Sequence, residues 1–212
     1  MRRPRYPGNV YKPGQAGEHF FPYLLRKPEW FIDLGPANAT EYLDARAMFP
    51  EVKLIGLEPS PVGYQRALER WPKDGSYLLN SAAWDTDARI RLYKASDLRH
   101  GTAYADAEKV AVEDLSGESS DWVEVEARSL DSIDQQYGPF REAALWLDVE
   151  GSERRVLKGA KRLLEGGVIT SVNIETRPHL AEEFDRVLRG YGFTSIRRYL
   201  ECETYWDEVW VR

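Results

Sequence analysis

Two carboxylates directly follow an apolar run in LWLDVEGSERRVLKGAKRLLEGG, which spans residues 145–167. The apolar run predicts a buried strand that stops at Asp148 and Glu150, Gly151 predicts a turn, and a period of about 3.6 residues predicts a helix immediately afterwards. In an open parallel α/β sheet, ligands bind at the carboxyl ends of the strands, where helix N-termini point into a shared crevice. These carboxylates are therefore candidates for a functional site.

Two other predicted strands also end in residues that can bind a ligand. Asp33 and Gly35 end WFIDLG, and Glu58, 25 residues after Asp33, ends KLIGLEP. An acid at this distance commonly accepts both hydroxyls of a ribose. Ala37 and Ala39 stand where a dinucleotide-binding turn needs Gly, so NAD and FAD are disfavoured. A ribose without a neighbouring phosphate indicates S-adenosylmethionine, whose sulfonium and ammonium groups suit carboxylate partners.

Glu175 ends the next strand, VITSVNIET, and His179 opens the following helix, so both border the same predicted crevice. Asp148 could hold the methionyl end of the cofactor, position an acceptor hydroxyl or act as a general base. Glu150 is equally typical of a first-turn helix acid, which the macrodipole stabilises by about 0.3–1 kcal/mol. His179 is also typical of a surface residue that caps its helix. These four residues together offer ligands for a divalent cation, although no metal is predicted.

The third predicted strand, SYLLNSAAW, ends in small residues. Ser81 and Ala82 leave room for an adenine ring whose edge can bond to the backbone, and core packing explains them equally well. Trp84 either stacks on the adenine or packs into the core.

One domain, residues 29–212, is predicted to alternate strands and helices after an N-terminal arm, residues 1–28. The arm contains one short helix at HFFPYLLR, whose aromatic residues either fold over a cofactor or pack on the domain. Around residues 89–128, RIRLYKA and WVEVEAR have a period of two, which predicts antiparallel strands in a β-rich insertion. FTSIRRYL and YWDEVWVR predict a final antiparallel hairpin.

Composition excludes several classes of protein. The chain has 212 residues, is 42% hydrophobic and has a net charge of -6, so we expect one core and no general affinity for nucleic acids or acidic membranes. No apolar run approaches the roughly 20 residues of a membrane span, and MRRPRYPGNV lacks the apolar core of a signal peptide. The single cysteine, Cys202, excludes an internal disulfide and fits a cytoplasmic location.

The order of these motifs resembles the FkbM-type S-adenosylmethionine-dependent methyltransferases. The resemblance runs from Phe31 to Glu175, and its most specific part is LDVEGSERRVLKGA at residues 147–160. The shorter matches are FIDLG from Phe31, EPSP at 58–61, AAWD at 82–85, SLD at 129–131 and IE at 174–175.

This resemblance implies a Rossmann-like class I methyltransferase fold, with a mostly parallel α/β sheet. It also implies methyl transfer to an oxygen of a sugar, a glycan or a small hydroxylated metabolite. The chain departs from the family's pattern at two places. Pro36, Ala37 and Ala39 replace fixed positions of the first turn, and Asn38 is displaced by one. Trp146 stands where the family commonly has Lys, so no role of that Lys carries over.

The residues and the resemblance together give one set of predicted site residues. Catalysis is assigned to Asp148, Glu175 and His179. Binding of S-adenosylmethionine is assigned to Asp33, Gly35, Pro36, Ala37, Asn38, Glu58, Pro59, Ser60, Ser81, Ala82 and Asp148. The alternatives are a non-catalytic nucleoside-binding module and a nucleic-acid methyltransferase that uses the basic arm MRRPRY.

Overall fold

A seven-stranded sheet organises the computed structural model, which describes residues 16–36, 40–94, 103–105, 122–199 and 202–212. The strand order is β3-β2-β1-β8-β9-β11-β10, and β11 lies antiparallel between β9 and β10. The strands are β1 (Trp30–Leu34), β2 (Lys53–Leu57), β3 (Tyr77–Leu79), β8 (Ala143–Leu147), β9 (Ile169–Thr176), β10 (Thr194–Tyr199) and β11 (Trp206–Val211). This confirms the predicted Rossmann-like sheet with a C-terminal antiparallel hairpin.

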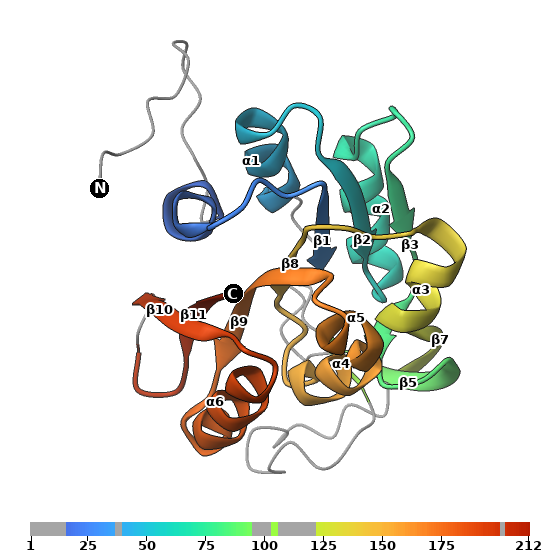
Figure 1. Cartoon of the computed structure of the whole chain (residues 1–212). Coiled ribbons are helices and arrows are strands. Elements are labelled where there is room, and N and C mark those ends of the chain that lie inside the picture. Colours follow the sequence, from blue (N-terminus) through green and yellow to red (C-terminus); the bar gives the residue numbers. More distant parts are fainter. Residues whose placement is uncertain (1–15, 37–39, 95–102, 106–121, 200–201) are drawn as a thin grey trace.

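Helices cover both faces of this sheet (Figure 1). One face carries α1 (Glu41–Met48), α2 (Pro61–Arg70) and two short helical turns, Ala16–Phe20 and Phe21–Tyr23. The other face carries α3 (Leu130–Tyr137), α4 (Glu153–Gly159), α5 (Lys161–Glu165) and α6 (Ala181–Gly190). Because the central strands are buried on both faces, they are almost continuously apolar. None of the described helices has the length and apolar character of a membrane span.

The region that was predicted as a β-rich insertion contributes to a second sheet, of order β4-β7-β5-β6. Its strands are β4 (Ala82–Trp84), β5 (Ala88–Lys94), β6 (Ala103–Ala105) and β7 (Trp122–Ser129). Strands β5 and β7 are antiparallel, which confirms the expectation from their period of two.

The prediction of SYLLNSAAW as one strand is wrong. It forms β3 in the main sheet and β4 in the second sheet. The side-chain amide of Asn80 donates to the carbonyl oxygens of Glu58 at 2.8 Å and Pro59 at 3.2 Å, which holds the chain between the two strands in a turn. Strand β4 then pairs in parallel with β7.

The helix predicted after Gly151 is also divided in two, at Ala160. The Asp131 carboxylate accepts hydrogen bonds from the backbone N–H groups of Arg162 at 2.8 Å and Leu163 at 3.1 Å. These bonds satisfy first-turn donors of α5, which begins a new helix there. Asp131 of the SLD motif therefore has a capping role.

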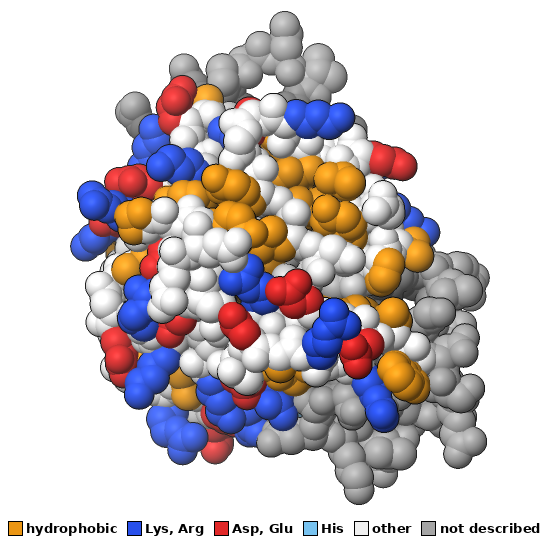
Figure 2. Space-filling view, turned by 90° about the vertical axis from the view of Figure 1, so that its right-hand side faces the viewer, with side chains coloured by type: hydrophobic (Ala, Val, Ile, Leu, Met, Phe, Trp, Pro, Cys, Tyr) orange, Lys and Arg blue, Asp and Glu red, His pale blue; other side chains and the backbone are white. Residues whose placement is uncertain are grey.

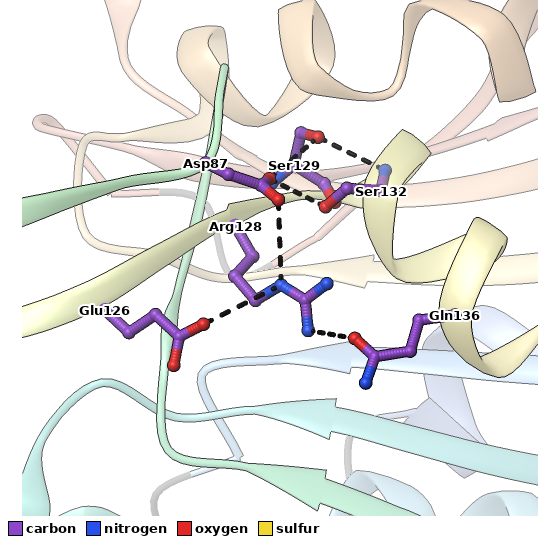
Figure 3. Close-up of polar contacts among 6 residues, drawn as sticks. All are labelled: Asp87, Glu126, Arg128, Ser129, Ser132 and Gln136. Carbon is purple, nitrogen blue, oxygen red and sulfur yellow. Dashed lines mark hydrogen bonds and ion pairs between the residues drawn. The ribbon is translucent and has the colours of Figure 1, made fainter.

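Helix α3 was not predicted, and Asp87 ties it to the second sheet (Figure 3). Asp87 Oδ1 accepts hydrogen bonds from Ser129 N at 2.9 Å and Ser132 Oγ at 2.7 Å. Burial raises the pKa of Asp87, but these hydrogen bonds outweigh it and leave the pKa below its ordinary value. Arg128 Nη1 donates a hydrogen bond to Oε1 of Gln136, on α3, at 2.7 Å. The Ser129 hydroxyl caps α3 by accepting a hydrogen bond from Ser132 N. A serine of this kind is typical of a helix start, so it was the signal in the sequence that could have predicted α3.

Candidate cofactor site

The carboxyl ends of β1, β2 and β8 meet at one edge of the main sheet. Leu34 pairs with Leu57 of β2, and hydrogen bonds continue the ladder beyond the strands. Gly35 N donates to Leu57 O at 2.9 Å, and Asp148 N donates to Leu34 O at 3.3 Å. The turn after β1 is therefore held between the residue that follows β2, Glu58, and the residue that follows β8, Asp148.

Gly35 allows this close approach of two backbone segments. Its φ is 87°, a conformation that side chains disfavour. A Cβ at this position would lie 2.1 Å from the carbonyl oxygen of Asp148. Pro36, the next residue, is buried, while Ala37 and Asn38 lie outside the described residues.

Asp33 is a buried carboxyl group at the end of β1, with 1% of its surface exposed. Among the described residues, neither of its carboxyl oxygens has a hydrogen-bond partner. Burial raises the pKa of Asp33 well above 3.8, and the charges of Glu41, Asp148 and Glu58 raise it further. Because an unsatisfied buried polar group is costly, a donor or cation of a ligand would complete this site.

Glu58 is buried after β2, beside the start of α2. Its Oε1 accepts a hydrogen bond from Ser60 N at 2.8 Å, and a Cβ on Gly63 would lie 2.8 Å from its carboxyl carbon. Burial raises the pKa of Glu58 to about 7, although the Ser60 N–H lowers it. Pro59 is half-buried, and the Ser60 hydroxyl caps α2 by accepting from Gly63 N at 3.2 Å.

Asp148 follows β8, whose last residue is Leu147. The next turn has two left-handed residues, Glu150 with a φ of 53° and Gly151 with a φ of 95°. Helix α4 begins only at Glu153, whose Oε1 accepts from Gly151 N at 3.0 Å. The interpretation of Glu150 as a first-turn helix acid is therefore wrong, because Glu153 occupies that position.

Negative charge accumulates around Asp148. Burial is the largest cause that raises its pKa to about 8, followed by the charges of Glu150, Glu175, Asp207 and Glu153. Burial also raises the pKa of Glu175, and Arg177, at 3.6 Å from Glu175, partly offsets this. In the described residues, no three His, Cys, Asp or Glu side chains are arranged to hold a metal ion.

His179 is exposed on the short 3-10 turn Pro178–Leu180, whereas Asp148 and Glu175 are half-buried. The structure places it soon after Glu175, which is close to the end of β9. Its assignment as a catalytic residue stays a prediction.

Ser81 and Ala82 do not end a strand of the main sheet, because β3 ends at Leu79 and β4 begins at Ala82. Ser81 is buried, and its hydroxyl has no hydrogen-bond partner among the described residues. It remains a candidate for contact with the cofactor.

Trp84 packs into the protein, which was one of the two alternatives for it. It is 5% exposed, and the guanidinium of Arg155 lies 4.7 Å from its ring. Arg155 also bonds Asp85 at 2.8 Å, and a Cβ on Gly159 would lie 1.9 Å from the carbonyl oxygen of Trp84. The AAWD motif and α4 therefore interlock, which gives the matching residues a structural role.

Two grooves lie away from this edge. One, of about 340 Å³, lies among apolar side chains between α2, β3 and α3, on the face that Figure 2 shows. The other, of about 700 Å³, is lined by Trp30, Lys53 and Tyr77, which are the first residues of β1, β2 and β3. Both differ from the candidate site, which is at the carboxyl ends of the strands.

The sequence profile of the FkbM methyltransferase domain matches residues 33–203, and so includes Asp33, Glu58 and Asp148. The chain belongs to the FkbM methyltransferase family. S-adenosylmethionine is the cofactor of this family. The buried Asp33 carboxyl, which has no hydrogen-bond partner among the described residues, fits a cationic cofactor of this kind.

A solved protein with bound S-adenosyl-L-methionine shares the fold of this FkbM domain. Fibrillarin from Aeropyrum pernix, in complex with S-adenosyl-L-methionine, is 12% identical; the match covers 89% of this chain and 70% of fibrillarin, with a TM-score of 0.52. Precorrin-6y C5,15-methyltransferase from Geobacter metallireducens is 9% identical; the match covers 86% of this chain and 78% of that protein, with a TM-score of 0.47. No curated protein matches the chain. The predicted class I methyltransferase fold is confirmed.

Three polar residues near this site of the FkbM domain were not predicted from the sequence. Asn80 fixes the loop after β2. Its position between two apolar runs, where a turn-forming residue is typical, was the signal in the sequence that could have indicated it. Glu153 is buried at the start of α4, and no spacing distinguishes it from a surface helix acid. Asp207 is buried on β11, which the alternating pattern of YWDEVWVR did not indicate.

The raised pKa values predict that the stability of the cofactor-free FkbM domain depends on pH. The pKa is about 8 for Asp148 and about 7 for Glu58, whereas carboxyl groups of unfolded chains titrate near pH 4. The folded protein therefore binds more protons between about pH 4 and about pH 8. The stability that comes from this extra proton binding is fully present below about pH 4 and is lost as the pH rises to about pH 8. We expect the Tm to fall between about pH 5.5 and about pH 8.5 in differential scanning fluorimetry.

Asp148→Asn removes one of these groups and should make the decline of Tm with pH shallower. Glu165→Gln, which changes an exposed acid on α5, is the matched control and should leave the decline unchanged. A Tm that rises steadily over this window would contradict the assignment of raised pKa values.

Replacing Glu58 with Ala should weaken binding of S-adenosylhomocysteine by about 1.5–3 kcal/mol, because a hydrogen bond to a charged group is lost. Isothermal titration calorimetry measures this change. Glu69→Ala on the exposed surface of α2 is the control, and Glu58→Gln keeps one acceptor for Ser60. An unchanged Kd for a folded Glu58→Ala variant would remove Glu58 from the site.

Proposed function

We propose that this FkbM methyltransferase methylates a hydroxyl oxygen of a sugar, a glycan or a small hydroxylated metabolite. The observation that carries the proposal is Asp148, a carboxyl group at the strand ends whose pKa is raised to about 8 by burial and neighbouring acids. A base with a pKa near the working pH is efficient at taking the proton of a hydroxyl group. The family resemblance supports an oxygen acceptor.

In this proposal, the residues around the strand ends divide the work between them. Glu58 accepts hydrogen bonds from the ribose hydroxyls, and Asp33 faces the cationic part of the cofactor. Bound S-adenosylmethionine supplies a methyl carbon whose bonding electron pair returns to sulfur. Asp148 receives the proton of the acceptor hydroxyl as the oxygen forms its new bond to carbon. Correct orientation of the acceptor supplies much of the rate enhancement.

Glu175 and His179 are proposed to assist on the acceptor side. The Glu175 carboxyl is held by Arg177 at 3.6 Å and is near enough to Asp148 to raise its pKa. Glu175 therefore keeps Asp148 basic, because a second negative charge nearby favours protonation. His179, which is exposed, can contact an acceptor that approaches from solvent.

S-adenosylhomocysteine should raise the Tm of this protein and NAD should not, because a ligand that binds only the folded state stabilises it. Differential scanning fluorimetry with both ligands tests the cofactor. Release of S-adenosylhomocysteine from S-adenosylmethionine in a panel of sugars and hydroxylated metabolites then tests the acceptor class. Stabilisation by NAD alone would refute the proposal, and binding without transfer to any acceptor would favour a nucleoside-binding module.

A further inference from the structure

Tyr205 is a solvent-exposed aromatic residue at the edge of the sheet that carries Asp148. It directly precedes β11, and 39% of its surface is exposed. The first residue of β11, Trp206, pairs with the last residue of β9, Thr176. Because β11 is antiparallel to β9 and β9 is parallel to β8, β11 begins at the edge where β8 and β9 end. Tyr205 therefore lies at the carboxyl ends of the parallel strands.

Tyr205 also lies on the same face of this edge as the acids of the candidate site. It precedes Asp207 by two residues, and side chains two residues apart along an extended chain point to the same face of a sheet. Asp207 pairs with Glu175, and the register of β8 and β9 places Asp148 beside Glu175. The pKa of Tyr205 agrees with this placement. Partial burial is the largest cause that raises this pKa, and the charges of nearby groups follow, namely Cys202, Glu175, Asp207 and Asp148.

A short turn holds Tyr205 at this position and leaves its side chain exposed. Cys202 N donates to the carbonyl oxygen of Tyr205 at 2.9 Å, and the Cys202 thiol donates to the same oxygen at 3.4 Å. The next residue, Trp206, packs within the hairpin instead. Its indole N–H donates to Glu208 Oε2 at 3.3 Å, and the guanidinium of Arg198 lies 4.9 Å from its ring. Of these two aromatic residues, Tyr205 is the one that a ligand can reach.

An exposed aromatic ring beside hydrogen-bond acceptors suits a ligand that has an apolar face and several hydroxyl groups. A tyrosine supplies a large, rigid contact surface at a small cost in conformational entropy. Ligand sites commonly combine such rings with a few polar groups that fix the orientation of the ligand. A pyranose ring has a face of C–H groups and an edge of hydroxyl donors, and carboxylates accept hydrogen bonds from hydroxyls. The ring and the acids therefore match two surfaces of the same sugar.

The charge at this edge favours a neutral sugar. Asp148, Glu175 and Asp207 are acids, and Arg177 is already paired with Glu175 at 3.6 Å. An anionic acceptor, such as a uronic acid or a phenol that has lost its proton, would bring another negative charge to these acids, which is unfavourable. A neutral pyranose brings no charge.

We infer that Tyr205 binds the methyl acceptor by stacking on the C–H face of a pyranose ring, and that the acceptor is a neutral saccharide. Stacking on Tyr205 fixes the plane of the sugar, so that one of its hydroxyl groups is directed to Asp148. Tyr205 thereby determines acceptor specificity and takes no part in holding the cofactor. This inference rests on the proposed function, because it describes the acceptor of the same reaction.

The test is saturation-transfer difference NMR on the full chain saturated with S-adenosylhomocysteine. This measurement detects weak binding and shows which protons of a ligand contact the protein. The probes are the methyl pyranosides of glucose, galactose, mannose and rhamnose, with glucuronic acid and catechol for comparison. We expect a neutral pyranoside to bind with its strongest signals on the C–H groups of one face. Glucuronic acid and catechol should bind more weakly than this pyranoside.

Three variants test the part of Tyr205 in this binding. Tyr205→Ala should weaken binding of the pyranoside by about three- to ten-fold, the range for loss of an aromatic contact, and leave the Kd of S-adenosylhomocysteine unchanged. Tyr205→Phe keeps the ring and should bind the pyranoside as the parent does. Tyr77→Ala is the matched control, because Tyr77 is also 39% exposed but begins β3, at the opposite edge of the sheet.

Equal binding of the pyranoside by the parent and Tyr205→Ala would overturn the inference, as would a preference for glucuronic acid or catechol over every pyranoside. A loss in Tyr205→Phe as large as that in Tyr205→Ala would also overturn it, because the hydroxyl and not the ring would then bind the ligand. If S-adenosylhomocysteine itself does not bind, the proposed function fails. If it binds and no pyranoside does, the inference about the acceptor fails alone.

Discussion

Replacing Asp148 with Asn is expected to lower the rate of methyl transfer by about 10²-fold or more, the usual range for loss of a general base. Asn has nearly the same shape and cannot take up the hydroxyl proton. Asp148 is half-buried beside other acids, which raises its pKa to about 8, so removing its charge should not destabilise the fold. Single-turnover methyl transfer, measured beside the Kd of S-adenosylhomocysteine, separates the chemical step from binding.

Two companion variants define the role of Asp148 more closely. Glu175→Gln should lower the rate less and move the pH profile of the reaction toward lower pH, since a negative charge beside Asp148 is lost. Glu165→Gln on the exposed face of α5 should change neither quantity. Parental rates for Asp148→Asn, Glu175→Gln and His179→Ala alike would mean that these residues are structural.

Gly35→Ala is the second change with a large expected effect. Its Cβ would lie 2.1 Å from the carbonyl oxygen of Asp148, so the turn after β1 must move away from β8. We expect the free energy of unfolding to fall by about 3–5 kcal/mol, from backbone strain together with the displaced contact. Binding of S-adenosylhomocysteine should weaken by at least about ten-fold, because this turn positions Asp33 and Asp148.

Gly75→Ala is the matched control for this substitution. Gly75 has a similar φ, 92° against 87° for Gly35, and a Cβ added to it would have no other atom within 4 Å. It should therefore cost only about 1–2 kcal/mol, the strain of a left-handed residue, with no change in the Kd of S-adenosylhomocysteine. Urea unfolding and calorimetry measure both effects. Equal losses for the two variants would show that the contact with Asp148 has no special importance.

The order of strands and helices could be predicted because each signal was local. The apolar runs that end at Asp33, Glu58 and Asp148 identified three central strands, and these strands are buried on both faces. The period of two in β5 and β7 likewise identified antiparallel strands. Long-range contacts overrode local patterns elsewhere. Asn80 divides an apolar run by bonding to the loop after β2, and Asp131 begins a new helix 31 residues further along the chain.

Several candidate site residues could be predicted to lie together because their positions follow from strand ends. Parallel strands in register bring their ends together, so the acids Asp33, Glu58 and Asp148 lie close to one another. Asp207 and Glu153 were missed, because an isolated polar residue in a strand or first helical turn has the same local pattern when buried or exposed. Trp84 and the SLD motif match the family, and the structure gives them packing and capping roles.

The sequence by itself determined the FkbM family, the alternation of strands and helices and the acids at the strand ends, since all of these depend on local residue types and spacing. Only the tertiary structure decided which acids are buried together and which polar atoms have partners. Burial and charge depend on neighbours from distant segments: β11 inserts beside β9 and brings Asp207 to Glu175. The same assembly leaves the carboxyl oxygens of Asp33 without hydrogen-bond partners among the described residues.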